Sequence, residues 1–80
     1  MKAKVTVRLK HGVLDPQGKA VLHAAQALGF SGLGDVRVGK IFEIDLGELS
    51  EDKAQTVLEE LSSKLLANGV IETYEVELVK

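Results

Sequence analysis

The residues that interrupt regular structure are concentrated in one part of this 80-residue chain. Residues 12–40 hold its only proline and six of its eight glycines. Asp15 followed by Pro16 predicts a helix start, because the aspartate can accept an unpaired backbone N–H and proline has no N–H to leave unpaired. Gly29 is the matching stop, since glycine readily adopts the left-handed conformation that ends helices. Between them, four apolar residues recur at helical spacing: Val21, Ala24, Ala25 and Leu28.

Alternating apolar and polar residues predict strands before and after this helix. Residues 3–9 alternate without error, and residues 74–78 do the same near the end of the chain. On both sides of Gly39, five apolar residues share even-numbered positions: Val36, Val38, Phe42, Ile44 and Leu46. This parity fits either a three-residue turn at residues 39–41, which would make two strands, or one long strand kinked at the glycine.

A second helix is predicted to begin at Ser50. Its hydroxyl can cap the helix, and Glu51 and Asp52 would lie in the positive first turn. The apolar residues that we expect to be buried along this helix are Ala54, Val57, Leu58, Leu61 and Leu65.

The predicted fold is one α+β domain over residues 1–80. Its order is strand, helix, strand, strand, helix, strand, which favours a two-layer sandwich with an antiparallel four-stranded sheet and both helices on one face. The first strand would be central. Residues 1–40 hold seven Lys and Arg against two Asp and Glu, and residues 41–80 hold three against ten. The basic face of the first strand, with Lys4, Arg8 and Lys10, would then lie between acidic neighbours: Glu43, Asp45, Glu75 and Glu77.

Composition excludes several classes of function. A chain this small buries only about 60% of its unfolded surface, so we expect it to oligomerise. The absence of cysteine excludes disulfides and thiolate metal sites, and three aromatic residues give no platform for stacking bases. We find no long uncharged apolar run and no signal peptide pattern, and we expect a soluble cytoplasmic protein.

Few residues offer chemistry. His11 and His23 have no partner at metal-binding spacing, and we interpret both as ordinary histidines. Gly18 falls in the first helical turn, where glycine costs about 1 kcal/mol relative to alanine. Gly18 therefore indicates that another backbone or an anion approaches closely, or else that a weak helix end is tolerated. The negative charge of Asp15 beside it argues against a phosphate. Arg37 and Lys40 have two interpretations. They are either solvated charges at the edge of the sheet, or they bind an acidic surface or a phosphate.

Four segments together carry a resemblance to a known family. They are Gly-Val-Leu-Asp-Pro-Gln-Gly-Lys-Ala-Val at 12–21, Leu-Gly-Phe at 28–30, Val-Arg-Val-Gly-Lys at 36–40 and Val-Ile-Glu-Thr-Tyr-Glu-Val-Glu at 70–77. With this spacing the chain resembles the PurS family, the small subunits of phosphoribosylformylglycinamidine (FGAM) synthase.

The resemblance implies an assembly role in purine biosynthesis. In this family a glutaminase (PurQ-type) subunit releases ammonia from glutamine. A synthetase (PurL-type) subunit uses ATP and magnesium to activate the formamide oxygen of formylglycinamide ribonucleotide, and ammonia then displaces phosphate to give the amidine. PurS proteins, as homodimers or tetramers, bridge the two subunits.

The resemblance implies no catalytic residue, no bound cofactor or metal, and no nucleic-acid or membrane partner for this chain. Residues in two segments are expected to contact partner subunits: Asp15, Pro16, Gln17, Gly18 and Lys19, and Arg37, Gly39 and Lys40.

Two other classes of protein have a similar order of elements. An amino-acid-binding regulatory module of the ACT type also dimerises, and its ligand loop would coincide with residues 12–18. An RNA-binding domain fits less well, because it needs exposed aromatic residues and a basic sheet face.

Overall fold

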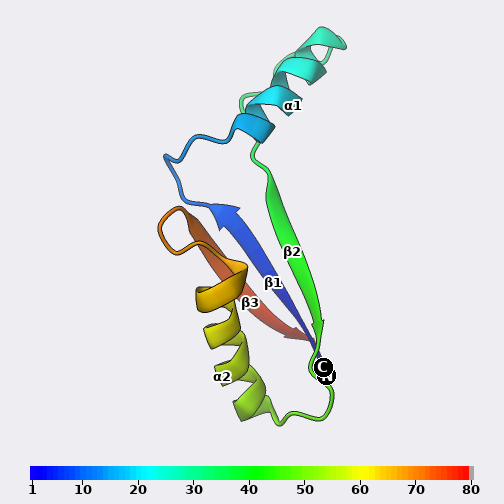
Figure 1. Cartoon of the computed structure of the whole chain (residues 1–80). Helices are drawn as coiled ribbons and strands as arrows, with labels where there is room; N and C mark the ends of the chain where they lie inside the picture. Colours follow the sequence, from blue (N-terminus) through cyan, green and yellow to red (C-terminus); the bar gives the residue numbers. More distant parts are fainter. Residues whose placement is uncertain (80) are drawn as a thin grey trace.

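A computed structural model describes residues 1–79 of the chain. Strands and helices alternate along it: β1 (Lys2–Leu9), α1 (Pro16–Ala27), β2 (Gly39–Asp45), α2 (Glu51–Leu61) and β3 (Glu72–Val79), with a short π-helical segment, η1 (Ser62–Leu66), continuing α2. The strands form one antiparallel sheet in the order β2-β1-β3 (Figure 1). The α+β class and the central position of the first strand are as predicted.

The predicted four-stranded sheet is wrong, because the structure has three strands. The chain reaches β2 through residues 31–38, which have no regular secondary structure, and β2 then runs from Gly39 to Asp45 with no turn at residues 39–41. A Cβ atom on Gly39 would lie 2.9 Å from the carbonyl oxygen of Val7. This glycine therefore allows β2 to approach β1 closely at its first residue, rather than making a turn or a kink.

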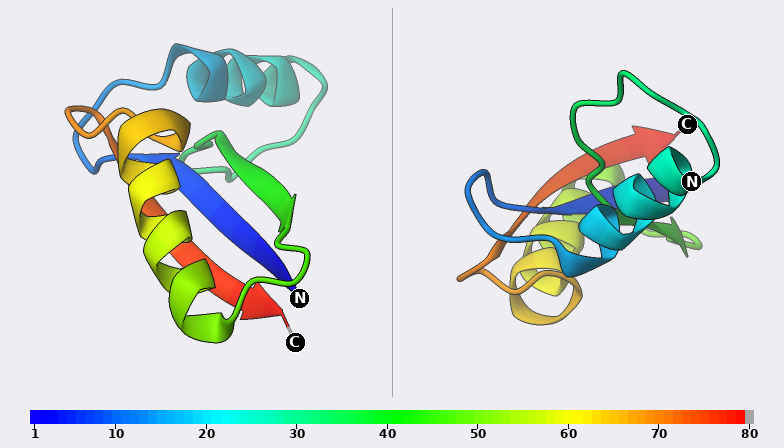
Figure 2. Two further views of the ribbon diagram at one scale, coloured as in Figure 1. Left: turned by 60° about the horizontal axis from the view of Figure 1, so that its bottom comes forward. Right: turned by 90° about the horizontal axis from the view of Figure 1, so that it is seen from above.

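The prediction that both helices cover one face of the sheet is also wrong. Only α2 lies across the sheet, whereas α1 projects beyond its end (Figures 1 and 2). We call α1 together with residues 28–38 the arm. The molecule measures 49 × 26 × 15 Å with a radius of gyration of 16.1 Å, against roughly 12 Å for a compact domain of this length. The elongated shape results from the arm.

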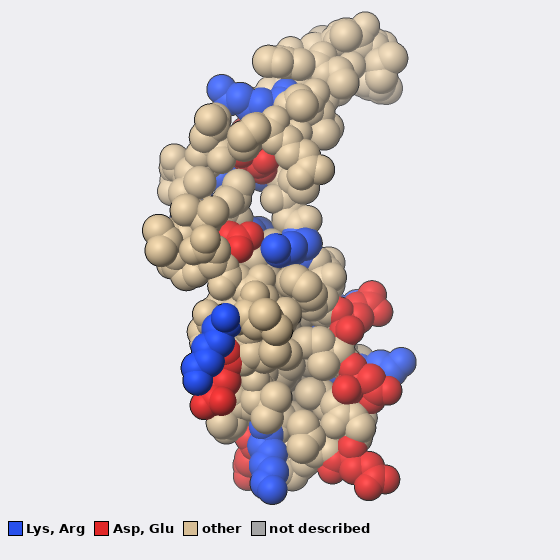
Figure 3. All heavy atoms as spheres, viewed as in Figure 1, with Lys and Arg blue, Asp and Glu red and all other residues tan. Residues whose placement is uncertain are grey.

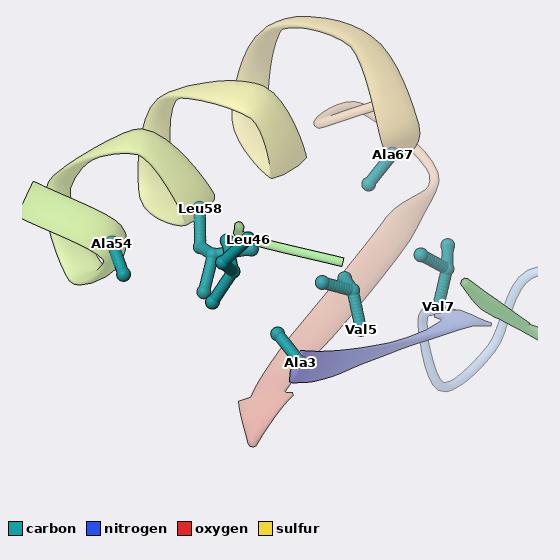
Figure 4. Packing of buried hydrophobic residues seen from close by; sticks show 7 residues of the cluster. All are labelled: Ala3, Val5, Val7, Leu46, Ala54, Leu58 and Ala67. Carbon is teal, nitrogen blue, oxygen red and sulfur yellow. The ribbon is translucent and has the colours of Figure 1, made fainter. Parts of the chain in front are cut away.

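The hydrophobic core lies between α2 and the central strand. Ala3, Val5 and Val7 on β1 are almost completely buried, and the side chains of Ala54 and Leu58 point toward them from α2 (Figure 4). The predicted stripe on this helix is only partly right, because Val57 is 43% and Leu65 is 73% exposed. The core is aliphatic and small.

The face of the sheet opposite α2 carries the predicted charge pairing. Lys4 on β1 lies between Glu43 on β2 and Glu77 on β3 in the strand register. Arg8 lies 3.4 Å from Glu75, in an ion pair open to solvent. The uneven charge of the two halves of the chain is thus matched across the sheet.

Both predicted helix starts and the predicted end of the first helix are confirmed. Asp15 caps α1 and Ser50 caps α2, each by accepting a backbone N–H three residues ahead. At the other end of α1, Gly29 is left-handed (φ +98°), and the N–H of Phe30 donates to the carbonyl of Ala25 at 3.0 Å. This is the glycine-terminated end expected from the sequence. Within residues 1–79, neither helix has the length and apolar character needed to cross a membrane.

Candidate assembly interface

One carboxylate ties together the two ends of the arm at its base. Asp15 is 5% exposed. Its Oδ1 accepts the N–H of Gly18 at 2.8 Å, and its Oδ2 accepts the N–H of Val38 at 2.7 Å. Two hydrogen bonds lower the pKa of this carboxyl below its ordinary value, that from Val38 first and that from Gly18 second. The nearby positive charge of Arg37 lowers the pKa further. The carboxylate is therefore ionised at neutral pH, with both oxygens occupied.

Gly18 explains why the first turn of α1 contains a residue that disfavours helix. A Cβ atom at this position would collide with the backbone carbonyl of Val36. The close approach predicted for Gly18 is therefore made by the chain's own backbone, and a tolerated weak helix end does not account for it. The helix start and the segment that returns to the sheet are packed directly against each other.

The structure brings the two predicted contact segments together at the base of the arm. Asp15 and Gly18 are buried between them, whereas the other predicted contact residues are exposed: Pro16, Gln17, Lys19, Arg37, Gly39 and Lys40. Arg37 donates from Nη2 to the carbonyl of Lys10 at 3.3 Å, and Lys40 lies 3.9 Å from Glu72. Contact between these residues and a partner subunit stays a prediction.

The surface of the arm is apolar and uncovered. Val21 is 47% exposed and Leu28 is 77% exposed, so the stripe predicted on this helix is not buried within the chain. Phe30 and Leu33, which follow the helix, are 62% and 46% exposed. Residues 20–34 contain no Lys, Arg, Asp or Glu, and the outer end of the arm is free of charged side chains in Figure 3. This exposed apolar surface makes the arm a candidate interaction site.

Sequence reasoning did not identify these arm residues as candidate contacts. The available signal was the uncharged run of residues 20–34 in a chain in which 28% of residues are charged. Helical spacing within it was interpreted as packing against the sheet.

Neither histidine joins a metal site in the described part of the chain. His11 and His23 are both exposed. Over residues 1–79, no group of three or more His, Asp or Glu side chains is placed to hold a metal ion.

The fold defines a class of small α+β protein with a three-stranded sheet and an exposed apolar arm. Comparison with known proteins identifies the family. Residues 2–80 match the family model PurS, described as phosphoribosylformylglycinamidine (FGAM) synthase. The chain therefore belongs to the PurS family, as the sequence motifs indicated.

The sequences of individual relatives align with nearly the whole chain. The FGAM synthase subunit PurS of Bacillus subtilis is 46% identical over 77 residues, covering 96% of this chain and 90% of the relative. The PurS subunit of Methanocaldococcus jannaschii is 39% identical over 79 residues, covering 99% of this chain and 95% of the relative. This chain is thus of the kind that serves as a subunit of FGAM synthase in purine biosynthesis.

Solved structures share the fold. The structure of B. subtilis PurS matches with a TM-score of 0.89 at 44% identity, covering 99% of this chain and 98% of that one. A chain in the structure of PurLQS from Thermotoga maritima matches with a TM-score of 0.84 at 25% identity, covering 98% and 95%. The T. maritima relative is therefore found in a complex.

Proposed function

We propose that this chain is the non-catalytic assembly subunit of an FGAM synthase complex, in which it bridges a PurL-type synthetase and a PurQ-type glutaminase and supports ammonia transfer between them. The observation that carries the proposal is the arm, which exposes Val21, Leu28, Phe30 and Leu33 on an uncharged segment. The T. maritima relative in a PurLQS structure supports it.

A bridging subunit is useful because of the chemistry of ammonia. In water at neutral pH, ammonia is mostly protonated to ammonium, which has no lone pair and cannot attack an activated carbon. A complex that holds the glutaminase against the synthetase shortens the path and limits this protonation. In this proposal ATP and magnesium act in the synthetase, no cofactor binds to this chain alone, and the complex works in the cytoplasm.

The proposal includes self-association into a homodimer or tetramer. The chain exposes 5870 Å², roughly 1,200 Å² more than the ~4,700 Å² expected for a compact protein of its mass. A standard interface buries about 800 Å² on each partner. The excess surface is therefore large enough for one stable interface. No observation favours the amino-acid-binding alternative, and we do not propose it.

Reconstitution tests the bridging role. Synthetase and glutaminase subunits are mixed with or without this chain, and amidine formation is assayed with glutamine and, separately, with an ammonium salt. We expect glutamine-dependent synthesis to require the chain. Ammonium-dependent synthesis should proceed without it, because external ammonia bypasses the transfer.

Two outcomes would contradict the proposal. Unchanged glutamine-dependent activity without the chain would exclude a bridging role. A requirement for the chain in the ammonium-dependent reaction would place its contribution inside the synthetase rather than in ammonia transfer.

A further inference from the structure

A pocket of about 300 Å³ opens between the end of β1 and the base of the arm. It is lined by Arg8 and Leu9 at the end of β1, His11 just after it, and Arg37, Val38 and Gly39 where the arm returns to the sheet. Its charged or polar lining residues are Arg8, His11 and Arg37. Because no carboxylate lines this pocket, its wall favours an anion.

Both arginines retain donors for a ligand. Arg37 uses Nη2 for the carbonyl of Lys10 at 3.3 Å, and a guanidinium group has five N–H donors in all. Arg8 is paired with Glu75 at 3.4 Å, with the two side chains 62% and 77% exposed. An ion pair as exposed as this one is worth little, so a bound anion can compete for the guanidinium.

The adjoining pocket provides a contrast within the same molecule. It measures about 420 Å³ and shares Leu9, Val38 and Gly39 with the first. Its walls also carry two carboxylates, Asp15 and Glu72, and one cation, Lys40, which lies 3.9 Å from Glu72. Two carboxylates against one lysine make this pocket less favourable for an anion than the pocket lined by Arg8 and Arg37.

We propose that Arg8 and Arg37 bind the phosphate group of a small phosphate monoester in the first pocket, with His11 as a further hydrogen-bonding group. Phosphate fits better than carboxylate because it carries about −1.5 to −2 charges at pH 7 and three acceptor oxygens, enough for two guanidinium groups. A volume near 300 Å³ is at the small end of ligand sites. This site shares Arg37 and Gly39 with the predicted partner contacts, and the chain alone is tested for it by binding.

The test is a titration of the full chain, in its solution oligomeric state, followed by NMR. The probes are inorganic phosphate and ribose 5-phosphate, with ribose as the phosphate-free control, all at constant ionic strength. We expect saturable shifts of the amides of Arg8, His11 and Gly39 with both phosphate compounds and none with ribose. Arg37→Gln should weaken binding about tenfold, because it removes a charge-assisted hydrogen bond.

Two further variants make the result decisive. Arg8→Gln removes the second guanidinium without touching a backbone hydrogen bond, so it tests the site even if Arg37→Gln disturbs the arm. Lys53→Gln removes the same charge from α2 and should leave binding unchanged. Equal weakening by Lys53→Gln, or shifts that do not saturate, would mean an adventitious ion only and would overturn the proposal.

Discussion

Asp15 joins the start of α1 to a residue 23 positions further along the chain. One of its carboxylate oxygens caps α1 by accepting the N–H of Gly18. The other accepts the N–H of Val38 and so holds the segment that leads into β2. Beside it, Gly18 leaves room for the backbone of Val36. These two residues fix how the arm leaves the sheet, although neither belongs to the hydrophobic core.

Replacing Gly18 by alanine should destabilise the protein. The new methyl group meets the carbonyl of Val36, and overpacking of this kind costs about 1–3 kcal/mol. Denaturant unfolding at fixed protein concentration measures the loss. Gly34→Ala is the matched control, because a Cβ atom there meets nothing within 4 Å, and it should change stability by less than about 0.5 kcal/mol. Equal effects of the two substitutions would refute the close approach at Gly18.

Asp15→Asn should weaken the protein at pH 7 but not in strong acid. An amide replaces one of the two carboxylate oxygens by an NH2 donor, so it cannot accept the N–H groups of Gly18 and Val38 at the two separate positions. The pKa of Asp15 is lowered in the folded state from its ordinary value of 3.8. Its contribution is therefore complete above about pH 4 and is lost as the pH falls through the lower folded pKa.

Unfolding curves of wild type and the Asp15→Asn variant between pH 7 and pH 2 test this. The difference in midpoint should shrink as the pH falls. A difference that stays constant over this range would show that the charge of Asp15 has no part in it. Asp35→Asn removes a nearby exposed carboxylate and serves as the control.

At the scale of elements, α2 and α1 show two uses of an apolar helical face. The face of α2 that carries Ala54 and Leu58 is buried against β1, whereas Val57, one residue away from Leu58, is 43% exposed. On α1, the only fully buried position is Gly18, at its first turn. Thus α2 stabilises the sheet, and α1 is held only at its base.

Truncation at adjacent positions tests this orientation of α2. Leu58→Ala should lower the free energy of unfolding by about 2–5 kcal/mol, because it leaves a cavity in a core with few large side chains. Val57→Ala should cost about 0.5 kcal/mol or less. Chemical denaturation of both variants measures the two losses of unfolding free energy. A larger loss for Val57→Ala than for Leu58→Ala would mean that the buried face of α2 is assigned wrongly.

The whole molecule is more extended than a compact domain of its length. Its radius of gyration is 16.1 Å, and the arm leaves large apolar side chains in solvent. Covering this surface with a second copy or with a partner subunit would recover the burial that a small domain lacks alone. The elongated shape is thus consistent with the proposed assembly role.

Sedimentation velocity tests self-association through the arm. The wild-type chain should sediment as a dimer or larger species, and Leu28→Lys should shift it toward the monomer by placing a charge in the interface. Leu28 is the C-cap of α1, where lysine is compatible with the helix dipole. Val70→Lys changes an equally exposed residue outside the arm and should have no effect. A monomeric wild type, or equal shifts in both variants, would refute association through the arm.

The sequence alone determined the local features of this protein and its family. Both helix starts, the glycine stop at residue 29, the central first strand and its charge pairing follow from neighbours along the chain or from strand alternation, and all are present in the structure. The four motifs that resembled PurS proteins identified the family correctly.

Only the tertiary structure decided where α1 lies and how many strands the sheet has. Helical spacing specifies an apolar face, but the face is the same whether the chain's own sheet or another protein covers it. Apolar parity around Gly39 likewise fits two short strands or one. Gly18 signalled a close approach but not its partner, which is the backbone of Val36. These outcomes depend on contacts between residues far apart in sequence, and local patterns do not encode them.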